Sequence, residues 1–139
     1  MNGYDVYQED IVARLYPNLA CSTATGIEIA GVTSGRWIDR RGYRFRAEVA
    51  PLLDLSMGLA NSNAAAQVAS ELAADRPVIN GAMGHATVLT AMTYLRDQFG
   101  RGMPQQITVR DPWPGNRNRR TLSPQEALGT FFIAAVRVS

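Results

Sequence analysis

The chain is organised around the segment from Gly81 to Asp111, which reads GAMGHATVLTAMTYLRDQFGRGMPQQITVRD. It contains His85, the only histidine of the chain, between a glycine and a run of strand-forming residues. A second β-forming run, at 107–110, ends at Asp111, which begins a Pro-rich turn. Two neighbouring strands that carry a histidine and an acid at their ends are able to form the base and the orienting residue of a nucleophile–His–acid site.

Helical patterns come first in the chain, and strand patterns dominate after this point. Apolar spacing and capping residues predict helices at 5–16, 26–32, 63–74 and 124–128. Short strands are expected at 78–82, 86–94, 106–110 and 131–138, with two more between residues 36 and 49. The arginine-rich segment 116–120 reads as a solvated loop. This order predicts a single α+β domain over residues 1–139, with mostly antiparallel strands.

Composition excludes several classes of protein. The net charge of +2 is too small to indicate a nucleic-acid or membrane partner. With one cysteine and one histidine and no ligand spacing between them, neither an internal disulfide nor a metal site is expected, and no cofactor is indicated. The first residues lack the features of a signal peptide, and no apolar run approaches the roughly 20 residues that span a bilayer. These features fit a cytoplasmic protein or one exported by a signal-independent route.

Several segments of the C-terminal half resemble one family. They are VING (78–81), GHATVLTAM (84–92), VRDPWPG (109–115), LSPQEAL (122–128) and FFIAAVRV (131–138). Together they resemble the histidine and acid motifs of papain-like cysteine peptidases of the compact bacterial type, which include plant-pathogen effector proteases and bacteriocin-leader peptidases. The resemblance implies a papain-like fold, with N-terminal helices packed on the sheet. It also implies cleavage of a peptide or protein substrate by a cysteine thiolate paired with a histidine. His85 matches the base, and Asp111 matches the residue that orients it.

Two assignments of the nucleophile are open. In the first, the thiolate is Cys21, the only cysteine, which keeps the family order of Cys, His and acid. However, the segment ACSTATGIEIAGV lacks the Trp and the paired Ala typical of the family, and its glycines and β-branched residues weaken a helix. In the second, the segment 5–16 matches the part of the family that follows the nucleophile helix. That helix then precedes Met1, and Cys21 lies in a loop. Propensity and family order both favour the second assignment.

The two assignments predict different functions. With a thiolate, the chain is a peptidase that acts through Cys21, His85 and Asp111. Without one, His85 and Asp111 have nothing to activate, because the members of a triad act as a unit. The chain is then a truncated, inactive peptidase domain, or a non-catalytic papain-like module that binds a peptide or a partner protein through the same groove. A nucleic-acid binder that uses arginine is a third alternative, since all 14 basic residues are Arg.

Overall fold

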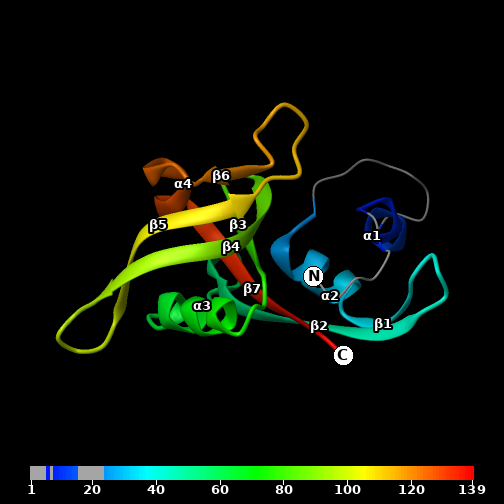
Figure 1. The fold of residues 1–139 in the computed structure, drawn as a ribbon, viewed down its shortest axis with the longest axis horizontal. Helices are drawn as coiled ribbons and strands as arrows, with labels where there is room; N and C mark the ends of the chain where they lie inside the picture. The colour runs from blue at the N-terminus through cyan, green and yellow to red at the C-terminus, as the bar shows by residue number, and fades with distance from the viewer. Residues whose placement is uncertain (1–5, 7, 16–23) are drawn as a thin grey trace.

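The computed structural model describes residues 6, 8–15 and 24–139. In this part of the chain, seven strands form one sheet in which every neighbouring pair is antiparallel. The strands are β1 (Gly35–Ile38), β2 (Arg44–Asp54), β3 (Val78–Ala82), β4 (His85–Arg96), β5 (Gly102–Arg110), β6 (Arg119–Thr121) and β7 (Thr130–Val138). Their order across the sheet is β1-β2-β7-β3-β4-β5-β6, so the last strand lies inside the sheet, between β2 and β3 (Figure 1).

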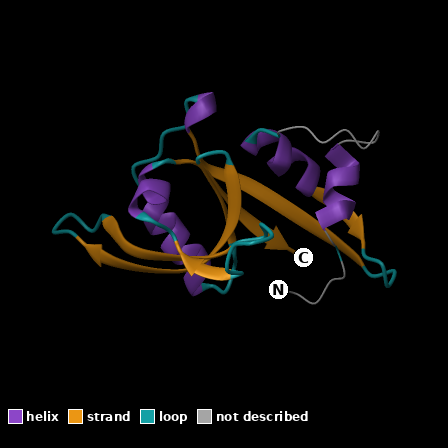
Figure 2. Cartoon of the chain, turned by 90° about the horizontal axis from the view of Figure 1, so that it is seen from above, coloured by secondary structure: helices purple, strands orange, loops and turns teal. Residues whose placement is uncertain are grey.

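Helices pack on this sheet in two separate groups. They are α1 (Gln8–Leu15), α2 (Gly26–Thr33), α3 (Ala64–Ala73), α4 (Pro124–Leu128) and a short 3₁₀ helix, η1 (Leu55–Met57). Helix α2 packs on β2 and β7 and contacts α1, whereas α3 contacts β4 and β5 and also reaches β2, β3 and β7. The two groups lie at different ends of the molecule (Figures 1 and 2). Helices together with an antiparallel sheet confirm the predicted α+β class.

The sheet has a hydrophobic core on each face. Successive side chains of a strand point to opposite faces, so Val78 and Ile79 of β3 belong to different cores. Val78 packs with Val68 of α3, and with Leu89, Val109 and Leu122. Ile79 packs against the second cluster, which contains Ala30, Val49, Phe132 and Ala134. The central strands β3 and β7 are therefore covered on both faces.

The helices and strands expected from the sequence are present in the part of the chain that the structure describes, although β2 runs on to Asp54 and β5 begins already at Gly102, both beyond their predicted bounds. Two elements were not expected, the short helix η1 and the strand β6. The segment 116–120 was predicted to be a loop, but its last two residues open β6, which pairs with β5. This strand is too short for a periodic pattern, and it forms only because β5 offers a free edge.

Helix α2 forms despite a sequence that is poor for a helix. Thr25 accepts a hydrogen bond from the Glu28 amide, and the Glu28 carboxylate accepts one from the Thr25 amide, which completes a capping box. Ala30 is buried against the second core. At Gly26 the helix approaches the sheet so closely that a Cβ atom would overlap the ring of Phe132. Glycine at this position therefore permits close packing rather than weakening the helix.

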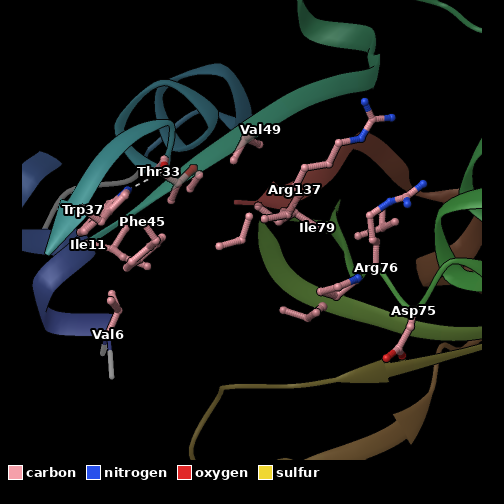
Figure 3. A pocket seen from close by; sticks show the side chains of 16 residues that line it. Val6, Ile11, Thr33, Trp37, Phe45, Val49, Asp75, Arg76, Ile79 and Arg137 are labelled. Atoms are coloured by element: carbon pink, nitrogen blue, oxygen red, sulfur yellow. Dashed lines mark hydrogen bonds between the residues drawn. The ribbon is translucent and has the colours of Figure 1, made fainter. Parts of the chain in front are cut away.

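An apolar hollow of about 440 Å³ lies beside this second core. Figure 3 shows Trp37, Phe45 and Ile11 on one side of it, and Ile79, Arg76 and Arg137 on the other. Both arginines bind Glu71, with Arg76 Nε 2.5 Å and Arg137 Nη2 2.9 Å from its carboxylate oxygens. The residue of β4 that lines the hollow is Val88. His85 is not part of its lining, so this hollow is separate from the site described next.

Candidate functional site

The tight turn between β3 and β4 places His85. Met83 and Gly84 have φ angles of 51° and 76°, so both are left-handed, as in the two-residue turns that join antiparallel strands. Ala82 before the turn pairs with His85 after it. The imidazole is therefore on the first residue of β4, at the edge of the sheet, and its side chain keeps 27% of its exposure.

Strand register brings Asp111 to His85. Val88 of β4 pairs with Arg110, the last residue of β5, so Asp111 emerges beside the start of β4. His85 Nε2 lies 2.7 Å from Asp111 Oδ1. The structure thus brings together two of the three residues singled out in the sequence. The third, Cys21, lies outside the described residues.

Asp111 is buried, and its two carboxylate oxygens are held separately. Oδ1 faces His85 and also accepts a hydrogen bond of 2.9 Å from the Trp113 amide. Oδ2 accepts hydrogen bonds from Asn116 Nδ2 at 2.9 Å and Arg120 Nε at 2.8 Å. These donors leave the carboxylate little freedom to rotate.

The same contacts keep Asp111 ionised. Burial by itself raises the pKa of this carboxyl group, because it disfavours the charged form. The hydrogen bonds from the Trp113 amide and the Arg120 guanidinium act in the opposite direction, as do those from His85 and Asn116. They outweigh burial, and the pKa of Asp111 lies well below its ordinary value.

An ionised carboxylate decides which ring nitrogen of His85 carries the proton. It can only accept hydrogen bonds, so Nε2 is the protonated nitrogen and faces Asp111. In the neutral ring, Nδ1 then has its lone pair free to accept a proton. A base held in one tautomer by a buried acid is the arrangement that nucleophilic catalysis requires.

Trp113 stands beside the imidazole and is open to solvent. Its ring meets the His85 ring edge to face, with centroids 5.8 Å apart, yet 63% of the residue is exposed. Met83, two residues before His85, is 68% exposed. Large exposed apolar side chains beside an acid–histidine pair form a surface that is suited to contact a ligand.

A chain of ion pairs continues behind Asp111. Arg120 Nη1 and Nη2 donate hydrogen bonds of 2.9 Å and 2.7 Å to the two carboxylate oxygens of Glu126, near the start of α4. Hydrogen bonds from Arg120 lower the pKa of Glu126, and the contacts with Ser123 in the capping box lower it further. Burial acts in the opposite direction, but the pKa still falls to about 2. Figure 1 shows α4 and β6 together with the loop that follows β5.

Sequence reasoning missed Arg120 and Asn116 as parts of the site. Both lie in the segment that was predicted to be a solvated loop. Register explains Arg120: it pairs with Val109, which places it diagonally across from Asp111 on the same face of the sheet. The Asp-to-Asn spacing of five residues is common in turns, so the sequence contains no specific signal for Asn116.

Within the residues that the structure describes, no three His, Cys, Asp or Glu side chains gather as a metal site would require. In the same part of the chain, no helix is both long and apolar enough to cross a membrane. The fold and site thus define an α+β protein in which a partly exposed histidine, at the start of one strand, contacts a buried acid that follows the next strand. Comparisons with protein-family models, with curated proteins and with solved structures find no match to this chain.

Proposed function

We propose that the chain is a papain-like cysteine peptidase domain in which His85 is the base and Asp111 orients it. The observation that carries the proposal is the 2.7 Å contact of His85 Nε2 with a buried, firmly held carboxylate. This contact leaves Nδ1 as the nitrogen that exchanges a proton with a nucleophile. A surface histidine without a catalytic role needs no buried carboxylate to hold its ring.

The chemistry proceeds in two steps. The Nδ1 atom of His85 takes the proton of a cysteine thiol, and the thiolate attacks the carbonyl carbon of the scissile peptide bond. The imidazolium is stabilised by Asp111 and gives its proton to the departing amine, which leaves a thioester. Water, deprotonated by the same nitrogen, then hydrolyses the thioester and restores the thiol. Cys21 supplies the thiol under the first assignment of the nucleophile.

Alkylation of Cys21 by iodoacetamide tests this proposal. If Cys21 is the nucleophile, we expect fast labelling in the parent chain and a loss of roughly tenfold or more in rate in His85→Ala, because the thiolate is the reactive form and His85 creates it. Asp97→Asn, in the distant turn between β4 and β5, is the control and leaves the rate unchanged. Slow labelling that does not respond to His85→Ala excludes Cys21 as the activated nucleophile.

A non-catalytic module that binds peptides is the second candidate. The exposure of Trp113 and Met83 beside His85 favours it, since this apolar surface can hold a peptide whether or not a thiolate is present. This candidate predicts that binding of a peptide pool survives Cys21→Ala and that no peptide is cleaved. Cleavage that Cys21→Ala abolishes would exclude it.

A further inference from the structure

Arg120 occupies a position that a surface arginine rarely has. Its side chain is only 20% exposed, and it lies between two carboxylates, Asp111 and Glu126. Its Nε hydrogen goes to Asp111, while both of its terminal nitrogens go to Glu126. The planar guanidinium is therefore fixed at both ends.

Glu126 is itself fixed by the first turn of α4. Its Oε2 accepts a hydrogen bond of 2.8 Å from the Ser123 amide, and the Ser123 hydroxyl accepts one of 3.2 Å from the Glu126 amide. Pro124 occupies the start of the helix and favours its backbone conformation. Leu122, just before the cap, is buried in the first core. The end of Arg120 that is remote from His85 is thus held by the capped first turn of α4, which follows a residue of the first core.

We infer that Arg120 is a positioning residue, which α4 holds through Glu126 and which fixes Asp111 so that Oδ1 faces His85. With Oδ2 bound to Arg120, rotation of the carboxylate would break a charged hydrogen bond. His85 then keeps a single tautomer and a single ring orientation. A catalytic role for Arg120 rests on the proposed function. Its role in fixing Asp111 and His85 does not.

Arginine is needed here for a geometric reason. Its planar fork presents donors to Asp111 and Glu126 at the same time, in directions set by its bonding. The single ammonium group of a lysine has no rigid fork and cannot keep both carboxylates in these positions. Glu126→Gln tests the other side of the contact, because the amide keeps the shape of the carboxylate and loses its charge.

Imidazole ¹⁵N and ¹H NMR tests the inference directly, since His85 is the only histidine and gives one set of signals. In the parent chain we expect one neutral tautomer, protonated at Nε2, with a protected Nε2 proton. In Arg120→Lys and in Glu126→Gln we expect loss of the protected proton and a mixture of both tautomers. Glu126→Gln is the milder change and remains informative if Arg120→Lys folds poorly.

Glu71→Gln is the matched control. Glu71 also binds two arginine nitrogens, from Arg76 and Arg137, and its pKa is likewise about 2. We expect the His85 signals of this variant to equal those of the parent. Parent-like signals in folded Glu126→Gln would overturn the inference, as would equal effects of Glu71→Gln and Glu126→Gln.

This experiment separates the inference from the proposed function. The NMR signals require neither a nucleophile nor a substrate, so they support or overturn the role of Arg120 even if the chain cleaves nothing. If instead Cys21 labelling depends on His85 while the Arg120 and Glu126 variants keep parent signals, the peptidase proposal stands and the positioning role of Arg120 fails.

Discussion

Met83 has a strained backbone conformation and lies in the turn that places His85. It has a left-handed φ of 51° at a turn position that favours Gly or Asn, and it immediately precedes Gly84 and His85. A side chain with a Cβ atom tolerates this conformation only at a cost in free energy. The site therefore starts from a turn that is not optimised for stability.

Met83→Asn should make the protein more stable. Asn adopts the left-handed conformation more easily than Met, and little buried apolar surface is lost because Met83 is exposed. We expect the free energy of unfolding to rise by about 1 kcal/mol, measured by urea denaturation. Met83→Leu keeps the strain and should match the parent. A less stable Met83→Asn protein would show that the Met83 side chain contributes contacts that outweigh the strain.

At the scale of elements, α2 shows how tertiary packing overrides propensity. The glycines and β-branched residues of 26–33 argue against a helix, but the capping box of Thr25 and Glu28 and the burial of Ala30 favour one. The two glycines of this helix have opposite surroundings. Gly26 lies against the ring of Phe132, whereas nothing lies within 4 Å of the Cβ position at Gly31.

Substitution of these two glycines by alanine should change stability in opposite directions. Gly26→Ala places a methyl group in the space of the buried Phe132 ring, and we expect a loss of about 1–3 kcal/mol from overpacking. Gly31→Ala meets no atom and restricts the unfolded chain, so a gain of about 0.5–1 kcal/mol is expected. Thermal and urea unfolding of both variants provide the measurement, and each serves as the control for the other. A less stable Gly31→Ala protein, or a Gly26→Ala protein as stable as the parent, would contradict the described packing of α2 on the sheet.

The whole molecule contains two arginine–glutamate clusters, one of which joins segments that are far apart in the chain. Glu71 of α3 holds Arg76 and Arg137, and Glu126 of α4 holds Arg120. Hydrogen bonds from these arginines lower the pKa of each carboxyl group from 4.5 to about 2. Because the folded state holds these groups ionised more strongly than the unfolded state does, the clusters couple stability to pH.

Acid should therefore destabilise the protein in a defined window. A carboxyl group with a lowered pKa contributes its full stability above the unfolded value near 4.5, and loses it as the pH falls towards about 2. We expect the free energy of unfolding, measured by urea denaturation at each pH, to fall across this range. The fall should be shallower in Glu71→Gln, which removes one of the two groups. An equal slope in the parent and in this variant would show that Glu71 does not contribute.

Local sequence was sufficient for much of the fold and for half of the site. Strand patterns, the turn before His85 and the capping boxes depend on residues close together in the chain. The contact of His85 with Asp111 also has a simple reason: His85 begins one strand, Asp111 follows the next, and consecutive strands commonly lie side by side. The papain-like resemblance was drawn from the same segments and stays a prediction.

Three features follow only from the tertiary structure. They are the support of Asp111 by Arg120 and Glu126, the close approach of α2 to Phe132, and the exposure of Trp113. Each depends on strand register or on packing between segments that are separate in the chain. A three-residue strand such as β6 has too few side chains to show a period, and an arginine next to another arginine looks the same in a solvated loop and in a buried ion pair. Short-range patterns in the sequence were therefore enough to predict most of the secondary structure and the acid–histidine pair. The sheet order and the support of Asp111 were decided only when register placed distant residues face to face.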